Sequence, residues 1–181
     1  MTGPPRPRTI SVWVALRALI WSTLFVGYVL VYIPWRYFGV DASHIRLAGP
    51  IGVLGMACLA AGTALMLACI AEFVASGPGT PAPMDPPRAL VSRGPYRFVR
   101  NPMYLGALLA LLGELALAPS RGLAAYIVGW FTLIQLFVVF YEEPTLRRKF
   151  GAAYEAYTLE VRRWWPRIPP RRRPDGERPV R

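Results

Sequence analysis

The sequence LVSRGPYRFVRNPMYLG spans residues 90–106, and the rest of the chain is arranged around it. It lies between two apolar blocks, so we expect it to begin at a membrane surface and to run into a membrane helix. Gly94-Pro95 is a turn signal. Asn101-Pro102 is typical of a helix start, because Asn can accept bonds from free amides and Pro fits the first helical position. We therefore predict a helix that begins at Pro102 and is capped by Asn101.

Three arginines, Arg93, Arg97 and Arg100, surround this helix start. A helix N-terminus does not favour cations by itself. Free amides and arginines beside aromatic side chains indicate a pocket for an anionic group on a partly apolar ligand. The alternative is that the arginines only flank a cytoplasmic helix end, as the positive-inside rule predicts.

The composition indicates a small polytopic membrane protein. The chain has 181 residues, of which 54% are hydrophobic and 17% charged. Its net charge is +11, but most arginines flank apolar blocks or lie in the tail, which favours membrane orientation over nucleic-acid binding. Cys58 and Cys69 are three helical turns apart in one apolar segment, so we expect them to be unbridged and to face the core or the membrane. With His44 as the single histidine, we predict no metal site.

Apolar runs predict an all-α polytopic integral membrane protein with four transmembrane helices. The second run is rich in Gly and Ala, which allows close helix packing in lipid. A Pro-rich loop, residues 76–89, is either an ordered frame for a site or a connector. We expect the basic ends, residues 1–9 and 167–181, to be disordered. The predicted spans are residues 10–33, 47–75, 102–118 and 123–141.

The basic residues predict the orientation of these spans. Four spans place both termini on one side of the membrane, and that side collects seventeen Lys and Arg against three on the other. By the positive-inside rule, the termini, residues 76–101 and the C-terminal region face the cytoplasm of an inner (plasma) membrane protein.

A helix at the cytoplasmic surface is predicted over residues 144–165. Apolar residues recur there at spacings of three and four, with Arg, Lys and Glu between them. We expect Pro144 to separate this helix from the fourth span, and Trp164-Trp165-Pro166 to anchor it at the interface. The apolar stripe consists of Leu146, Phe150, Tyr154, Tyr157 and Val161.

Three segments together resemble a known family. GPYRFVRNPMYLG (94–106), YEEPTLRRKFGAAYEAY (141–157) and VRRWWP (161–166) are similar, in order and spacing, to the isoprenylcysteine carboxyl methyltransferase family. These membrane-embedded enzymes use S-adenosylmethionine and are related to phospholipid methyltransferases. The resemblance covers about residues 72–166. It implies a methyltransferase that acts on a lipidic or prenylated acceptor from the bilayer, and it does not specify the substrate.

The resemblance also implies the site residues. Carboxylates suit the cations of the cofactor, while arginines and free amides suit its carboxylate. Glu142 and Glu143, at the end of the fourth span, are therefore candidate catalytic residues, with Glu142 also binding the cofactor. The alternative is that they only form ion pairs with Arg147 or Arg148. The other implied cofactor contacts are Arg88, Ala89, Leu90, Val91, Tyr96, Arg100, Asn101, Pro102, Met103 and Tyr104.

The sequence departs from the family pattern at two positions. Asn101 stands where the motif usually has His, and it offers a donor and an acceptor but cannot become cationic. Val138 stands where the enzymes that methylate a prenylcysteine carboxylate resemble one another in having Arg, one turn before the Glu. A carboxylate acceptor would then need another cation, such as Arg162 or Arg163, or the acceptor is not a carboxylate.

Other interpretations stay open from the sequence. Glu114, deep in the third span, is either a substrate-orienting group, a neutral packing residue or a group solvated near the outer interface. The whole protein is alternatively a nicotinamide-dependent reductase related to sterol reductases, or a non-catalytic membrane protein that binds a lipid. Oligomeric state cannot be read from these patterns.

Overall fold

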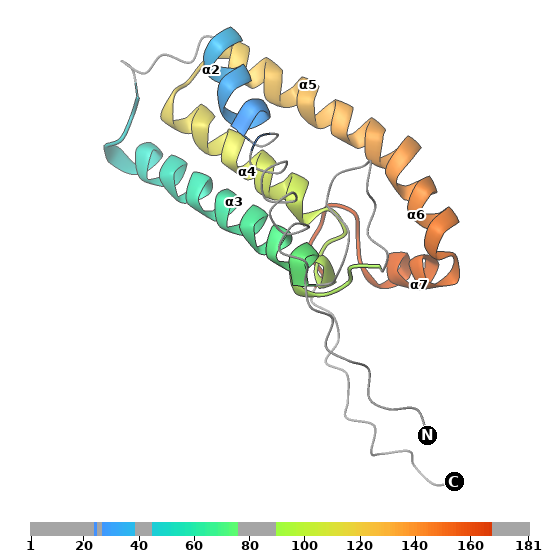
Figure 1. Cartoon of the computed structure of the whole chain (residues 1–181). Coiled ribbons are helices and arrows are strands. Elements are labelled where there is room, and N and C mark those ends of the chain that lie inside the picture. Colours follow the sequence, from blue (N-terminus) through green and yellow to red (C-terminus); the bar gives the residue numbers. More distant parts are fainter. Residues whose placement is uncertain (1–23, 25–26, 39–44, 76–89, 168–181) are drawn as a thin grey trace, which may run out of the picture.

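The computed structural model describes residues 24, 27–38, 45–75 and 90–167, and these residues form helices without strands (Figure 1). Two segments are π-helical turns, η1 and η4, and each runs directly into an α-helix. The elements are η1 (Tyr28–Tyr32), α2 (Ile33–Tyr37), α3 (Gly49–Ala75), the 3-10 helix η3 (Gly94–Arg97), α4 (Pro102–Leu117), α5 (Arg121–Phe137), η4 (Val138–Glu142), α6 (Glu143–Phe150) and α7 (Ala152–Glu160).

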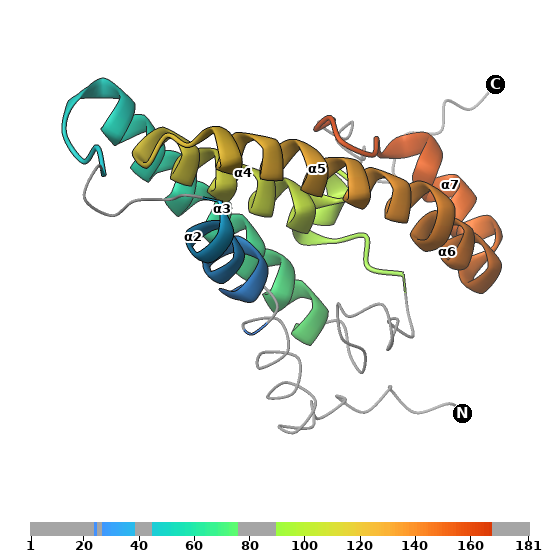
Figure 2. The same cartoon turned by 90° about the horizontal axis from the view of Figure 1, so that it is seen from above.

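Three long helices, α3, α4 and α5, run side by side with alternating direction (Figures 1 and 2). Ser120 caps α5, since its Oγ accepts a hydrogen bond from the Leu123 amide at 3.3 Å. The same hydroxyl donates to the carbonyl of Phe38 at 2.5 Å, which ties the end of α2 to this turn. A short turn therefore joins α4 to α5, and α5 begins two residues earlier than the predicted fourth span.

Glycines let α3 and α4 approach closely. A Cβ built on Gly62 would lie 2.5 Å from the carbonyl oxygen of Gly106, and one on Gly113 would lie 2.7 Å from that of Gly55. Only hydrogen fits at these positions, so the two backbones make direct contact. The small residues that the sequence placed in the second span thus pack against α4, in the way that membrane helices associate.

The hydrophobic core joins four elements. Side chains of η1, α3, α4 and α5 bury one another in a single cluster, and η1 and α2 lie over α4 and α5. The hydroxyl of Tyr126 in α5 donates to the carbonyl of Val29 at 2.8 Å and fixes this arrangement. The buried members of the cluster are Leu30, Met66, Ala107, Ala110, Leu111, Leu123 and Ile127.

The prediction that Pro144 ends the fourth span is wrong. Helical structure continues from Arg121 to Phe150, through η4 and into α6. The Glu143 amide donates to the carbonyl of Val138, five residues back, so the helix widens just before the proline. Because Pro lacks an N–H and its ring needs room, the wider turn accommodates it without a break. Pro34 is accommodated in the same way, so the first helix runs beyond Ile33 to Tyr37.

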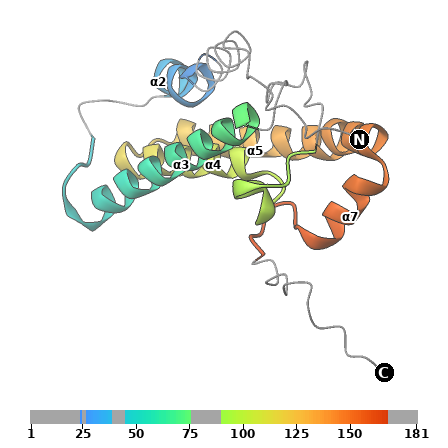
Figure 3. The same ribbon diagram turned by 60° about the horizontal axis from the view of Figure 1, so that its bottom comes forward.

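The prediction of a single helix over residues 144–165 is also wrong. Gly151, with φ +51°, separates α6 from α7 in a backbone conformation that side chains disfavour. α7 then turns back towards the start of α4, and residues 161–167 follow without helix (Figure 3). The predicted apolar stripe faces inward, with Tyr154 and Val161 buried.

Two helices of the described chain are long and apolar enough to cross a membrane, Gly49–Phe73 and Arg121–Phe150. A third apolar helix, Pro102–Leu117, is shorter. The helices α3 and α4 therefore begin and end within two residues of the bounds predicted for the second and third spans. The first span falls mostly outside the described residues, as do the ends 1–9 and 168–181, the Pro-rich loop, Arg88, Ala89 and His44. The count of four spans stays a prediction.

Candidate functional site

The two adjacent glutamates at the end of the fourth span lie in different environments. Glu142 accepts one hydrogen bond, from the hydroxyl of Tyr104 in the first turn of α4, at 3.1 Å. Glu143 is buried and binds two arginines. Arg163 donates from Nε at 2.7 Å and from Nη2 at 2.9 Å, and Nη1 of Arg100 lies 3.2 Å away. Within the described residues, Glu143 is thus paired with two cations and Glu142 with none.

Backbone pairing brings the two arginines together. The Arg100 amide donates to the carbonyl of Arg162 at 2.9 Å, and the Arg167 amide donates to that of Phe98 at 2.9 Å. The segment after α7 is therefore held against the segment before α4. Arg167, expected to start a disordered tail, is ordered by this bond. Hydrogen bonding to Glu143 raises the pKa of the Arg163 guanidinium, so the pair is ionised at every physiological pH.

The alternative in which the glutamates only pair with neighbouring arginines is wrong as stated. Arg147 binds Glu155 at 2.9 Å, and Arg148 donates to the hydroxyl of Thr145 at 3.2 Å. The arginine partners of Glu143 come from distant parts of the sequence. Spacing along one helix could not reveal them.

Asn101 starts α4 but does not cap it as predicted. It occupies the cap position with φ −119° and ψ 55°, and its side chain makes no capping hydrogen bond. The residue is only 7% exposed, and its Nδ2 has no hydrogen-bond partner among the described residues. Burying an amide donor without a partner costs free energy. Helix capping therefore does not explain why Asn101 is buried here.

Tyr96, in η3, is buried close to Tyr104 and Glu142. Its carbonyl accepts a hydrogen bond from the Tyr157 hydroxyl at 2.6 Å, and its ring meets Phe73 edge-on with centroids 5.5 Å apart. Burial raises the pKa of Tyr96 well above its usual value, and the nearby Glu142 and Tyr104 add to this. Burial also raises the pKa of Tyr157. Both hydroxyls are therefore neutral at physiological pH.

The remaining candidate contacts form the wall beneath Tyr96. Val91 and Cys69 are buried with Tyr96 in a second apolar cluster, against which Met103 packs. Leu90 is half-buried, and Pro102 is buried in the first turn of α4. Among the implied residues, the structure thus joins Tyr104 to Glu142, Arg100 to Glu143, and Val91 and Met103 to Tyr96.

The model of the family described as phospholipid methyltransferase matches residues 50–153, more than half of the 181 residues. The match runs from the first turn of α3 to the first turn of α7 and so includes the whole Tyr104–Glu142 region. The chain belongs to the phospholipid methyltransferase family. It is a membrane methyltransferase, related to the isoprenylcysteine enzymes that the sequence resembles. Searches of curated proteins and of solved structures gave no match.

Two residues proposed for the acceptor side have different positions in this phospholipid methyltransferase family member. Val138 is completely buried in η4, at 0% exposure. An arginine there would have to displace packed neighbours. Arg162 is exposed, whereas Arg163, its neighbour, binds Glu143. Sequence reasoning named Arg163 only as a possible cation, because its partner lies twenty residues away.

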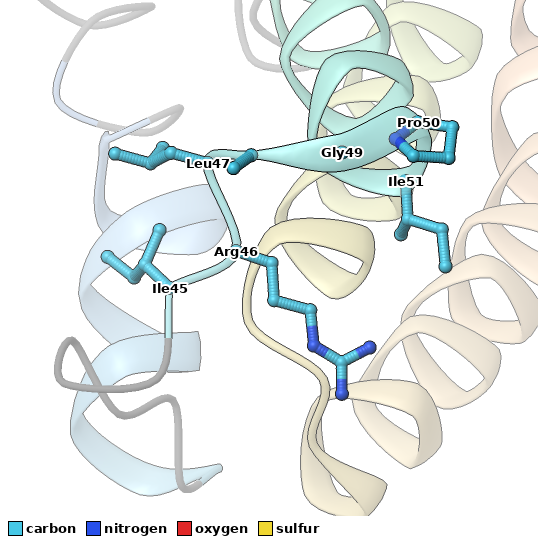
Figure 4. Close-up of a pocket in the computed structure, with 7 residues that line it drawn as sticks. Ile45, Arg46, Leu47, Gly49, Pro50 and Ile51 are labelled. Carbon is cyan, nitrogen blue, oxygen red and sulfur yellow. The ribbon is translucent and has the colours of Figure 1, made fainter.

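Two further features lie towards the opposite end of the helices. An open pocket is lined by residues 45–51, where the Arg46 side chain points away from those of Ile45 and Leu47 (Figure 4). The Arg46 amide donates to the carbonyl of Leu117 at 2.8 Å, which places this pocket at the end of α4 far from Tyr104. Glu114, in the last turn of α4, has one buried carboxyl oxygen without a partner among the described residues. Neither feature adjoins the Tyr104–Glu142 site.

Proposed function

We propose that this protein transfers a methyl group from S-adenosylmethionine to a lipid in the membrane. The site would lie where the first turn of α4 meets η4. The observation that supports this most is the carboxylate of Glu142, which receives a hydrogen bond from Tyr104 but has no cationic partner among the described residues. Such a carboxylate is suited to hold a cationic ligand.

The described residues fit this cofactor in their chemistry. S-adenosylmethionine carries a sulfonium, an ammonium and a carboxylate. Glu142 offers a negative group for the cations. Asn101 Nδ2 and Arg100 Nε are buried donors without partners in the described chain, and they suit the carboxylate. Arg100 and Asn101 directly precede the first turn of α4, which carries Tyr104, the partner of Glu142, so we expect one ligand with both charges to satisfy all three groups.

When bound, the cofactor supplies a methyl group on a positively charged sulfur. The lone pair of the acceptor bonds to the methyl carbon as the carbon–sulfur bond breaks, and the sulfur keeps the electrons of that bond. An amine acceptor would first lose its ammonium proton to water, which frees the lone pair, and the protein then mainly has to align the reactants. Glu142 would hold the cationic end, and Tyr104 would orient Glu142. Glu143 would position the wall through Arg100 and Arg163 rather than touch the reactants.

We infer that the acceptor is a lipid amine rather than a prenylcysteine carboxylate. A carboxylate acceptor needs a cation, but Val138 replaces the arginine of the prenylcysteine enzymes, Arg163 is bound to Glu143, and Arg162 is exposed. The family description, phospholipid methyltransferase, is consistent with a phospholipid headgroup. The lipid would enter from the bilayer, with both termini and the site on the cytoplasmic side, as the seventeen-to-three basic asymmetry favours.

The test measures S-adenosylmethionine binding to detergent-solubilised wild type and to the Glu142→Gln variant. Gln keeps the shape of the side chain and removes its charge. Breaking a poorly solvated charge pair costs about 3–5 kcal/mol, so affinity should fall at least about a hundredfold. Glu155→Gln is the matched control, because this exposed glutamate lies outside the site and should bind like wild type. Unchanged affinity in Glu142→Gln would show that Glu142 does not hold the cofactor.

Three comparisons separate this proposal from its rivals. NADPH titrated against the same protein should give no binding, whereas a reductase would bind it. Labelled methyl transfer to phosphatidylethanolamine vesicles should exceed transfer to a farnesylated cysteine analogue. Efficient methylation of the cysteine carboxylate would overturn the inference from Val138. A protein that binds lipid but neither cofactor would be non-catalytic.

A further inference from the structure

Among the described residues, two prolines lie in the interior of a continuous helical stretch rather than in its first turn, and each follows a π-helical turn of five residues. Pro34 follows Tyr28–Tyr32, and Pro144 follows Val138–Glu142. In both cases the residue before the proline donates its amide to the carbonyl five residues back. A proline has no amide N–H of its own to donate in a regular α-helix, and its ring collides with the carbonyl four residues earlier. The wider π turn removes this collision, so each proline excludes a regular α-helical turn at its position.

The two π turns differ in their surroundings: the first is completed by a core side chain, and the second holds the carboxylates of the site. In the first turn the next amide donor for the Val29 carbonyl would be residue 34, which is a proline. The Tyr126 hydroxyl donates to that carbonyl instead, at 2.8 Å, so this turn is completed within the core. The second turn ends at Glu142 and is followed by Glu143. Both carboxylates of the site therefore take their direction from the second turn.

The direction of these carboxylates depends on the extra residue in the turn. An α-helix rotates by about 100° per residue, so removing the extra residue would rotate everything after it by about that angle. The helix before the turn cannot rotate to compensate. Val138 is completely buried, and Gln135 accepts a hydrogen bond from Trp164 Nε1 at 2.7 Å. A regular helix would therefore swing Glu142 away from Tyr104.

We propose that Pro144 is a positioning residue, which keeps the η4 turn π-helical and so aims Glu142 at Tyr104. Its consequence for the cofactor rests on the proposed function, but its consequence for the Glu142–Tyr104 hydrogen bond does not. In Pro144→Ala the residue regains its N–H, and the carbonyl of Phe140, four residues earlier, becomes available to it. The turn can then revert to a regular helix, in which both Glu142 and Glu143 turn away from their partners, and the Tyr104–Glu142 hydrogen bond is lost.

The test is a double-mutant cycle on thermal stability. Tyr104→Phe, which removes the donor, and Glu142→Ala, which removes the acceptor, are made singly and together in wild type, in Pro144→Ala and in Pro34→Ala. In wild type the shift in Tm of the double variant should differ from the sum of the single shifts, because the two groups share a hydrogen bond. The same non-additivity should persist in Pro34→Ala, the matched control with the other π turn. In Pro144→Ala the shifts should become additive.

Non-additivity that persists in Pro144→Ala overturns the proposal, since Glu142 would keep its direction without the proline. Additive shifts in wild type overturn it too, because there would be no bond to position. S-adenosylmethionine affinity is measured in parallel and should fall at least tenfold in Pro144→Ala while staying at the wild-type value in Pro34→Ala. If wild type does not bind the cofactor, the proposed function fails, but the cycle still decides the role of Pro144.

Discussion

Replacing Glu143 by Gln should destabilise the protein, although the adjacent Glu142→Gln change should leave it folded. Glu143 binds Arg100 and Arg163 through three short contacts of 2.7, 2.9 and 3.2 Å. Its side chain is 9% exposed and that of Arg100 is 13% exposed, so water can do little to replace the lost charge. The substitution leaves both guanidinium groups without their carboxylate.

The expected magnitude follows from this burial. Removing one partner of a buried ion pair costs about 3–5 kcal/mol, and the retained amide oxygen of Gln keeps the loss near about 3 kcal/mol. For a chain of this size each kcal/mol corresponds to about 2–4 °C in Tm, so the Tm should fall by about 6–12 °C. The segment after α7 should also detach, because Arg163 helps to hold it against residues 98–100.

The assay is thermal unfolding of the purified variants in one detergent, with Glu155→Gln as the control. Glu155 also binds an arginine, Arg147, but these side chains are 56% and 52% exposed. An exposed pair contributes only about 0–1 kcal/mol, so this control should lie close to wild type. If both variants lower the Tm by the same small amount, the Glu143 cluster does not stabilise the fold and our reasoning from burial is wrong.

Two further predictions follow from the helix packing and from the basic residues. Gly62→Ala should destabilise by about 1–3 kcal/mol, because its Cβ would lie 2.5 Å from the Gly106 carbonyl oxygen. Gly129→Ala, whose Cβ meets nothing within 4 Å, should instead stabilise by about 0.5–1 kcal/mol, and thermal unfolding distinguishes the two signs. Reporter fusions at residues 85 and 181 should give cytoplasmic signals and those at 42 and 121 extracytoplasmic ones. A reversed signal at 85 or 181 would refute the four-span topology.

The sequence by itself determined the elements that depend on local chemistry. Apolar length predicted α3 and α4 to within two residues, because a membrane helix needs a continuous apolar run. Asn101-Pro102 marked the start of α4, since proline tolerates only a few helical positions. The motif around Tyr104 and Glu142 identified the family, because its residue types and order are specific.

Tertiary structure alone decided what the same residues do. Local rules predicted a break at Pro144 and a cap at Asn101, but a π turn accommodates the proline and the Asn101 side chain makes no capping hydrogen bond. The different environments of Glu142 and Glu143 depend on Arg100 and Arg163, because these arginines bind Glu143 rather than Glu142. Backbone pairing of distant segments brings them to the site. Helix propensity and periodicity describe only interactions between residues that are close along the chain. Hydrogen bonds and ion pairs between segments depend on how the helices are packed, and that packing sets the direction of each side chain.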